Sequence, residues 1–387
     1  MSRDRNRHAR RPATSRGSKE SMKFFQALAA AILVFTLAGA PALAQMPDTS
    51  GQADMQLTGP IRQQVIDKLI EEVNRSYVFP EVAKKIDAAL REQQRRGAYS
   101  RINSAQQLSE VLTNQLQATA TDRHLRVSYS EKPLPARGPS IEPTAAEVAG
   151  KLATLRLENF GVEKIERLPF NIGYLNLRGF APAQDAAETF AAAMTVLAHT
   201  DALIIDLRNN YGGDAAASTL LASYLFDKRT HLSDFNYREG NRVEQRWTLV
   251  VVPGLRYGQK KDVYLLTSKD TFSAGEDFAY ALKNLKRATL IGETTGGGAN
   301  AGDDRRLLPN FSVFIPLSRL ISPVTKTNWE GVGVTPDVSV PADDALKVAQ
   351  LTVLRKMAQS ENNPAKLSRL KERMAEVGAA AAGEQSP

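Results

Sequence analysis

The sequence predicts an α/β protein, a mixed sheet with flanking helices, preceded by a small N-terminal helical domain. Between residues 59 and 120 apolar side chains recur with a helical period. From about residue 121 short apolar strands alternate with helices, a pattern that favours an α/β core. Two of these strands end in turns rich in glycine or serine, directly before a helix. The 387 residues suffice for two or three hydrophobic cores, and their composition is typical of a globular protein.

Residues 1–44 are predicted to be a basic leader and a secretory signal peptide. Lys23 precedes a short apolar run that ends in Ala42-Leu43-Ala44, a small-residue cleavage site. A membrane anchor is the alternative, but a glycine and a proline break the run and no charged stop follows it. We therefore expect export to the periplasm or the medium, with cleavage after Ala44. Translation starts at either Met1 or Met22.

The leader accounts for most of the positive charge. Residues 1–44 carry eight basic and two acidic side chains, so about +2 of the formal net charge of +8 remains after cleavage. No basic stripe interleaved with aromatic residues is left, so we expect no nucleic-acid partner. Contact with a membrane is expected only through an uncleaved signal peptide.

Cysteine is absent from the sequence, which excludes a thiol nucleophile, disulfide bonds and a cysteine-based zinc site. The four histidines, His8, His124, His199 and His231, do not have a metal-binding spacing. We therefore expect no catalytic metal and no cofactor.

The N-terminal helical domain is predicted to span residues 59–120, after a polar linker at 45–58. Pro60 opens a first helix with an apolar residue at every fourth position, and Pro80 opens a second. A capping box at Ser104-Ala-Gln-Gln107 predicts the start of a third helix. Roughly sixty residues are too few for the whole catalytic unit, so we expect this domain to pack on the following residues.

The α/β core is predicted to span residues 121–345, with a C-terminal helical tail at 346–387. The strands at 201–208, 263–267 and 288–292 should pair within one sheet. A glycine-rich stretch at 294–302 is expected to be a flexible loop at the same edge. The other predicted elements are strands at 125–129, 171–178, 312–316 and 337–340, and helices at 183–199, from 215, and at 274–285.

Ser273 lies at the junction where a helix follows the strand at 263–267. There its hydroxyl would be exposed, and the free N–H groups of the first helical turn would face an oxyanion. Gly275 supplies only half of a Gly-x-Ser-x-Gly nucleophile elbow, since a threonine replaces the first glycine. The alternative is a capping box, in which Ser273 and Glu276 satisfy the start of the helix.

A second turn, Asn209-Asn-Tyr-Gly-Gly213-Asp214, also joins a strand to a helix. Its backbone N–H groups can converge on an anion, although a plain tight turn is the simpler interpretation of its two glycines. Ligands of such sheets bind beyond the carboxyl ends of the strands, so this turn and Ser273 should lie together. His124 lies at the mouth of the first strand of the core.

Four motifs occur in order over about residues 120–340: Asp206-Leu-Arg-Asn-Asn-Tyr-Gly-Gly213, Thr267-Ser-Lys-Asp-Thr-Phe-Ser273-Ala-Gly-Glu276, Ile291-Gly-Glu-Thr-Thr-Gly-Gly-Gly298 and Asn328-Trp-Glu330-Gly-Val-Gly-Val-Thr-Pro-Asp337. Together they resemble the tail-specific, or C-terminal processing, serine peptidases. The closer resemblance is to the branch of interphotoreceptor retinoid-binding protein and the tricorn protease core. It implies a crotonase-like or ClpP-like core in which Ser273 is the nucleophile.

The same resemblance implies that His124 is the general base and that Glu330 helps to orient it. Many members use a lysine as the base, but its position corresponds to Gly298 here. In the tricorn protease a serine adjoins the histidine, whereas Arg123 occupies that position here. The sequence therefore does not decide which group orients the His124 ring. The alternatives are that His124 is a structural histidine and that Glu330 is an exposed loop carboxylate.

We expect an exported serine peptidase that hydrolyses peptide bonds of unfolded or C-terminal protein segments. The N–H groups of Gly213 and Ala274 should bind the oxyanion. Between Tyr129 and Ile172 there are too few residues for the PDZ module that tail-selecting members insert. The rivals are a non-catalytic protein that binds a hydrophobic ligand or peptide in the same cleft, and an envelope scaffold. The serine favours the enzyme, and the missing lysine favours the binding protein.

Overall fold

The computed structural model describes residues 52–134 and 144–383. The predicted leader and signal peptide, residues 1–44, lie outside the described residues, as does the first part of the linker. Among the described helices, none combines the length and the apolar character that a bilayer span requires.

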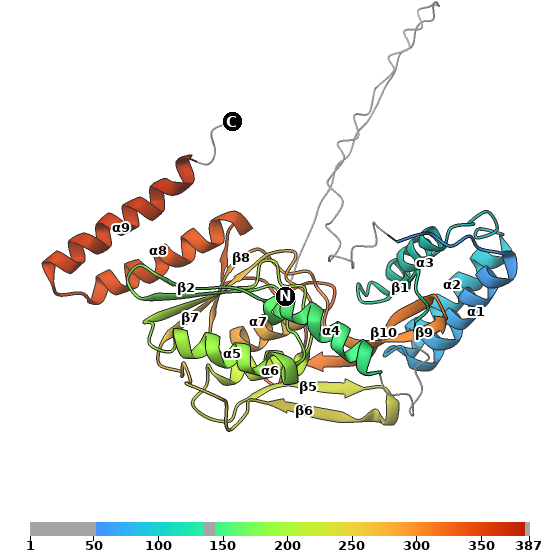
Figure 1. The fold of residues 1–387 in the computed structure, drawn as a ribbon, viewed down its shortest axis with the longest axis horizontal. Coiled ribbons are helices and arrows are strands. Elements are labelled where there is room, and N and C mark those ends of the chain that lie inside the picture. The colour runs from blue at the N-terminus through green and yellow to red at the C-terminus, as the bar shows by residue number, and fades with distance from the viewer. Residues whose placement is uncertain (1–51, 135–143, 384–387) are drawn as a thin grey trace, which may run out of the picture. The chain divides into compact units, whose positions relative to one another are not determined.

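Three helices open the described chain: α1 (Gly59–Ser76), α2 (Pro80–Arg95) and α3 (Ala105–Ala120). They begin at the predicted signals, since Pro80 is the first residue of α2 and the Ser104 hydroxyl accepts the Gln107 N–H at 2.9 Å. Their apolar faces share one hydrophobic cluster with the strands β1 (Arg126–Tyr129), β9 (Asn300–Leu308) and β10 (Phe311–Ile321). The helices therefore pack against these strands (Figure 1).

A six-stranded sheet forms the centre of the remaining chain, in the order β11-β8-β7-β4-β3-β2. Its strands are β2 (Val162–Leu168), β3 (Ile172–Leu177), β4 (Ala202–Asp206), β7 (Asp262–Thr267), β8 (Thr289–Gly292) and β11 (Val338–Ser339). All neighbours are parallel except β2, which runs antiparallel to β3. The predicted pairing of the three central strands is confirmed, and all five residues of β4 are buried, as the apolar run indicates.

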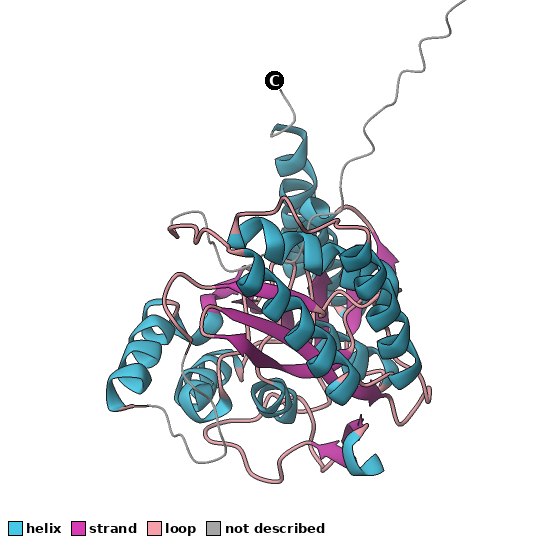
Figure 2. Ribbon diagram, turned by 90° about the vertical axis from the view of Figure 1, so that its right-hand side faces the viewer, coloured by secondary structure: helices cyan, strands magenta, loops and turns pink. Residues whose placement is uncertain are grey.

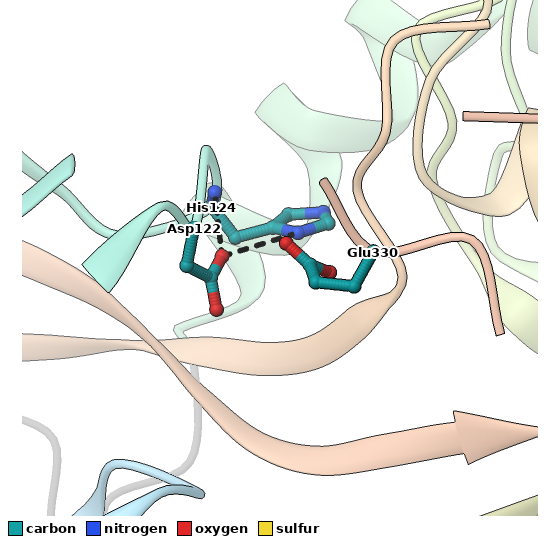
Figure 3. A group of neighbouring side chains, drawn as sticks. All are labelled: Asp122, His124 and Glu330. Atoms are coloured by element: carbon teal, nitrogen blue, oxygen red, sulfur yellow. Dashed lines mark hydrogen bonds and ion pairs between the residues drawn. The ribbon is translucent and has the colours of Figure 1, made fainter. Parts of the chain in front are cut away.

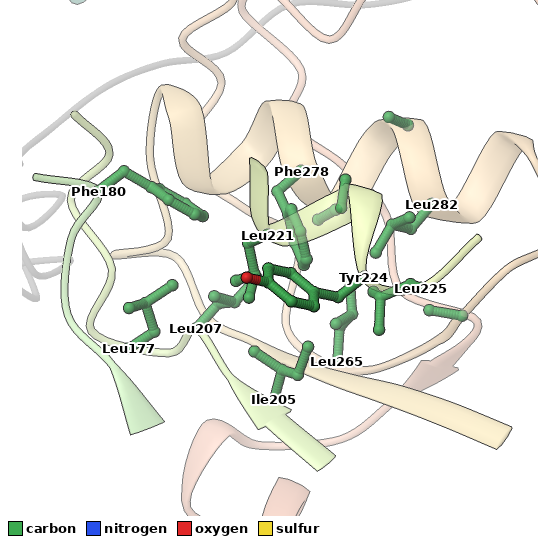
Figure 4. Close-up of a cluster of buried hydrophobic side chains, with 14 of the residues drawn as sticks. Leu177, Phe180, Ile205, Leu207, Leu221, Tyr224, Leu225, Leu265, Phe278 and Leu282 are labelled. Atoms are coloured by element: carbon green, nitrogen blue, oxygen red, sulfur yellow. The ribbon is translucent and has the colours of Figure 1, made fainter. Parts of the chain in front are cut away.

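Helices cover both faces of this sheet (Figure 2). On one face lie α5 (Ala183–Leu197), α6 (Ala215–Ser223) and α7 (Ala274–Asn284). Their core includes Phe278, Tyr224 and Leu265 (Figure 4). On the other face lie α8 (Ala342–Ser360) and α9 (Pro364–Gly383). The sheet thus lies between two layers of helices. The turns that follow β4 and β7 lie at the carboxyl ends of these strands, where sheets of this kind bind ligands.

A second sheet pairs β1 and β9 with β10, and β10 with β5 (His231–Tyr237), which pairs with β6 (Val243–Trp247). The sequence did not signal β2, β5, β6 or β9. In particular, the stretch at 294–302 was expected to be a loop throughout, whereas β9 begins at Asn300. These strands are rich in polar residues, and three of them lie at sheet edges, where one face is solvated and the apolar alternation is weak.

The remaining described elements are α4 (Ala145–Leu157) and two short 3-10 turns, η1 (Asn159–Gly161) and η2 (Glu239–Asn241). Helix α4 begins with a capping box between Thr144 and Glu147. None of its residues is buried.

Candidate active site

Ser273 stands at the corner between β7 and α7. Its backbone has φ 54° and ψ −118°, a conformation that few residues other than glycine adopt. The Ser273 N–H donates a hydrogen bond to Glu276 Oε2 at 2.9 Å, so the carboxylate contact of the predicted capping box is present. A β-carbon on Gly212 would lie 2.7 Å from Ser273 Cβ, which explains the glycine there. The hydrogen bond to Glu276 and the close packing of Gly212 therefore hold this corner in place.

His124 meets Ser273 across 149 residues of sequence, with its Nε2 atom 3.1 Å from Ser273 Oγ. The imidazole ring packs against Phe272 and Phe314, with ring centroids 4.7 and 5.7 Å away. Burial, helped by the positive charges of Arg126 and Arg123, lowers the pKa of His124 to about 3. The ring is therefore neutral at physiological pH, the state in which Nε2 can accept a proton.

Asp122 lies behind the imidazole and was not singled out from the sequence. Its Oδ1 atom accepts the His124 backbone N–H at 3.0 Å and lies 3.9 Å from His124 Nδ1. Its Oδ2 atom accepts from the Tyr77 hydroxyl and the Asn300 amide, each at 3.0 Å. Burial raises the pKa of the Asp122 carboxyl. An aspartate two residues before a histidine at a strand mouth is the one signal that could have indicated it.

Glu330 brings a second carboxylate to the same histidine (Figure 3). Its Oε2 atom accepts the N–H groups of Ala299 at 2.6 Å and Asn300 at 3.0 Å. Glu330 is half-buried, so it is not the exposed loop carboxylate that the sequence left as an alternative. Burial, and then the negative charge of Asp122, raise the pKa of Glu330 to about 8.

The polar atoms of this group converge without completing their hydrogen bonds. Within the described part of the chain, His124 Nδ1 and Glu330 Oε1 have no hydrogen-bond partner. Asp122, His124 and Glu330 each place one ligand atom within 4.8 Å of the others. Such a set can orient and stabilise an imidazolium, and its donor atoms are also of the kind that binds a metal ion.

The two expected oxyanion donors lie beside Ser273. Gly213 has φ 125°, and a β-carbon there would lie 2.2 Å from the Phe180 carbonyl oxygen, so the position requires glycine. Ala274 is the first residue of α7, where the helix dipole favours negative charge. Among the described residues, neither the Gly213 nor the Ala274 N–H donates a hydrogen bond. Gly213, Ser273 and Ala274 line one small hollow together.

Glu276 holds the glycine-rich loop that the sequence predicted to be flexible. The side chain is fully buried and accepts from the Thr295 hydroxyl and from the N–H groups of Gly297 and Gly298, at 2.5, 2.7 and 2.8 Å. Burial raises the pKa of Glu276 to about 7. The expectation of flexibility overlooked this buried carboxylate, because the sequence assigned Glu276 only to the helix cap.

Gly298, the position to which the family resemblance assigns a lysine in many members, lies against the histidine. A β-carbon at this position would be 2.3 Å from Phe272 Cζ and 2.7 Å from His124 Cε1. Any larger residue would therefore displace the imidazole or the Phe272 ring. A lysine at position 298 and the observed position of His124 are therefore incompatible in this packing.

Comparison with known proteins identifies a family and a fold. The sequence model of peptidase family S41 matches residues 171–340, and the model of the N-terminal domain of the S41 peptidase in eukaryotic IRBP matches residues 60–155. A solved structure of a Parabacteroides merdae protein gives a TM-score of 0.51 at 20% identity, covering 78% of this chain and 99% of that one. That likeness shows a shared fold.

Two processing peptidases are similar in sequence. Carboxyl-terminal-processing peptidase 2 of Arabidopsis thaliana, a chloroplast protein, is 28% identical over 172 residues, which are 44% of this chain and 32% of that protein. Carboxy-terminal processing protease CtpB of Bacillus subtilis is 22% identical over 216 residues, which are 55% of this chain and 43% of that protein. The chain thus spans less than half the length of these relatives.

Proposed function

The chain belongs to peptidase family S41, and from this premise we propose that it is a serine peptidase with Ser273 as nucleophile and His124 as general base. The observation that carries the proposal is the 3.1 Å distance between Ser273 Oγ and His124 Nε2. A nucleophile and its base must be this close for proton transfer. The family and its processing relatives support peptide bonds of unfolded or carboxyl-terminal protein segments as the substrate.

The reaction follows from the neutral state of the histidine. His124 Nε2 takes the Ser273 proton while Oγ attacks the scissile carbonyl carbon, whose oxygen becomes an oxyanion. The N–H groups of Gly213 and Ala274 stabilise that oxyanion. Nε2 then gives the proton to the leaving amine as the C–N bond breaks, which leaves an acyl ester on Ser273. A water molecule that His124 deprotonates hydrolyses the ester and restores the free hydroxyl.

The two carboxylates stabilise the imidazolium that forms in each half of the reaction. Burial raises the pKa of both carboxyls, that of Glu330 to about 8, so the Glu330 carboxyl is largely protonated at neutral pH while the His124 ring is neutral. An imidazolium beside them favours the charged carboxylates, which in turn offset the cost of the buried positive charge. Asp122 also fixes the ring through the His124 backbone N–H.

The proposed place of action is outside the cytoplasm. The support is sequence alone, namely the apolar run and Ala42-Leu43-Ala44 within the leader. Mass measurement of the protein recovered from the periplasm or medium should find Gln45 as its first residue. A full-length cytoplasmic product that begins at Met1 would refute export.

The proposed chemistry is tested by labelling with a fluorophosphonate, which reacts with activated serines. The wild-type protein should be labelled and should degrade unfolded casein, whereas Ser273→Ala should do neither while its melting temperature stays close to that of the wild type. A folded wild type that is not labelled and cleaves no unfolded protein would favour the binding-protein alternative.

A further inference from the structure

A pocket lies at the opposite edge of the six-stranded sheet from Ser273. It is formed where β7 and β8 begin, since Asp262 and Thr289, the first residues of these strands, both line it. The last turn of α7 also lines it, and this helix is about 16 Å long and begins directly after Ser273. The volume is about 460 Å³, which is within the range of small-molecule sites, roughly 300–1,000 Å³. The pocket is therefore separate from the candidate active site.

The charges that line this pocket do not balance. Its two carboxylates are already paired, Asp262 with Lys356 at 2.6 Å and Asp337 with Lys283 at 3.1 Å. The cationic side chains that line it are Lys261, Lys283, Lys286, Arg287 and Lys356. Among residues 52–134 and 144–383, Lys261, Lys286 and Arg287 form no salt bridge. The pocket therefore has an excess of three positive charges.

Two of these three cations are partly buried and bind only neutral acceptors. Lys261 Nζ donates to the Ala198 carbonyl, and Arg287 donates to the carbonyls of Leu225 and Gly258, each at 2.6 Å. Burial lowers the pKa of both side chains, and the positive charge of Arg287 lowers that of Lys261 further. Lysine has three N–H donors and arginine five, so both side chains retain donors for an anion.

The third cation, Lys286, occupies a backbone position that is usually glycine. It follows α7 with φ 54°, and its N–H donates to the Lys283 carbonyl while the Arg287 N–H donates to the Leu282 carbonyl. These two hydrogen bonds form a Schellman motif, whose left-handed residue is most often glycine because a β-carbon disfavours that φ. A lysine at this position thus disfavours the local backbone, and it adds an exposed cation to the pocket.

We propose that this pocket binds a small phosphate-bearing anion with two or more negative charges, either free or as the headgroup of a lipid. Such an anion combines its charge with several acceptor oxygens, and these match the remaining donors of Lys261, Lys286 and Arg287. A single carboxylate would offset only one of the three positive charges. The proposal does not depend on the peptidase function, because none of these residues contacts Ser273 or His124.

The dipole of α7 offers a simpler account of part of this cluster. Cations are favourable near the C-terminus of a helix, which suffices for Lys283 and Lys286. It does not account for Lys261, which precedes β7, or for the burial of Arg287, of which 8% is exposed. An anion accounts for all four side chains.

Isothermal titration calorimetry of the purified protein with inorganic pyrophosphate tests the proposal. We expect binding that weakens as the salt concentration rises. Acetate at the same ionic strength should bind at least about tenfold more weakly. Ser273→Ala should bind pyrophosphate as the wild type does, so the result is independent of the proposed catalysis. Absence of pyrophosphate binding, or equal affinities for acetate and pyrophosphate, would overturn the proposal.

Lys286→Gly separates binding from folding, because glycine favours the φ of this position. The Kd for pyrophosphate should rise by about tenfold, as for the loss of a hydrogen bond between charged groups, while the melting temperature does not fall. Lys326→Gly is the matched control, since Lys326 is also exposed, has φ 60° and lies outside the pocket lining. It should keep the wild-type Kd. An unchanged Kd in Lys286→Gly, or equal changes in the two variants, would contradict the proposed site.

Co-sedimentation with lipid vesicles distinguishes the two sources of the anion. The probes are phosphatidylcholine vesicles with and without about one fifth of phosphatidic acid. Binding that requires phosphatidic acid and is weakened by Lys286→Gly, but not by Lys326→Gly, assigns the pocket to a lipid headgroup. Pyrophosphate binding without vesicle binding assigns it to a free anion.

Discussion

Two turns at the same sheet edge, one from β4 to α6 and one from β7 to α7, begin a helix in different ways. At the first, Asp214 caps α6, since its Oδ1 atom accepts the N–H groups of Ala217 at 2.7 Å and Ala183 at 3.2 Å. At the second, the residue before the helix is Ser273, whose hydroxyl lies beside His124. Glu276 there binds the Ser273 N–H from three residues further on.

Under the proposed mechanism, the same supersecondary unit supplies two different chemical groups, a backbone N–H and a side-chain hydroxyl. In the β4–α6 turn the cap is a side chain, and the backbone N–H of Gly213 is left for a ligand. In the β7–α7 turn the anchor is Glu276, and a side-chain hydroxyl is left for the reaction. A substitution should therefore affect catalysis at one residue of each turn and stability at another.

The largest expected effect is that of Ser273→Ala on the β7–α7 turn. Hydrolysis of unfolded casein should fall by about 10⁴-fold or more, because the reacting atom is lost. The unfolding free energy should change by no more than about 1 kcal/mol, the value of a helix cap. Paired casein hydrolysis and thermal melting measure both. A variant that keeps wild-type hydrolysis would reduce Ser273 to a cap.

Gly213→Ala is the matching change in the β4–α6 turn. The added β-carbon meets the Phe180 carbonyl oxygen and the φ of 125° disfavours alanine, so the backbone N–H must move. We expect kcat to fall by about 10²- to 10³-fold, as for the loss of one oxyanion donor, with fluorophosphonate labelling slowed as well. The control is Ala216→Gly in α6, which removes a methyl group near the position where Gly213→Ala adds one. Unchanged kcat in a folded Gly213→Ala protein would exclude this N–H as a donor.

The pH dependence of activity should come from His124 beside the β7–α7 turn, because the β4–α6 turn contributes only a backbone N–H group to the site. Burial lowers the pKa of His124, so the free enzyme keeps a neutral base well below pH 6.5. A profile of kcat/KM against pH should show its acid limb below the ordinary histidine value of 6.5. An acid limb at or above 6.5 would mean that the histidine is more solvated than the structure indicates.

Glu276→Gln probes the anchor of the β7–α7 turn. One of the donors that now face the carboxylate would face an amide NH₂, so we expect a loss of about 1–3 kcal/mol in the unfolding free energy. The pKa of Glu276 is raised from 4.5 to about 7, so the folded protein retains a proton that the unfolded chain releases. Its contribution to stability is therefore fully present below pH 4.5 and is lost as the pH rises through 7.

Denaturant unfolding at a series of pH values measures this effect. The wild-type protein should lose stability over that interval more steeply than Glu276→Gln, which cannot titrate. Parallel curves for the two proteins would show that Glu276 does not carry a raised pKa.

The smallest expected effect is that of Asp214→Ala, the cap of the other turn. Loss of the hydrogen bond to the Ala217 N–H should lower the unfolding free energy by about 1 kcal/mol. Activity should fall far less than in Gly213→Ala, since the backbone donor remains. Chemical denaturation and casein hydrolysis compare the two variants. A loss of activity as large as that of Gly213→Ala would show that the cap also holds the donor in place.

The sequence was sufficient to predict what depends on local pattern. The apolar run of β4 and the strand, turn and helix around Ser273 placed the two candidate turns at one edge, and the structure has them there. Asp122 was missed because its significance depends on contacts with Tyr77, His124 and Asn300, the last of which is 178 residues away. Polar edge strands such as β6 and β9 were missed for the opposite reason, since their local pattern resembles that of a loop.

The hydrogen bonds around Asp122 also join segments that are far apart in the order of synthesis. Asp122 joins the end of α1, through the Tyr77 hydroxyl, to Asn300 at the start of β9, and Glu330 lies further along the chain. A growing polypeptide therefore holds His124 long before it holds the serine and the second carboxylate. Under the proposed mechanism, the nascent chain therefore has no complete catalytic group until the residues up to Glu330 have been made and have folded together.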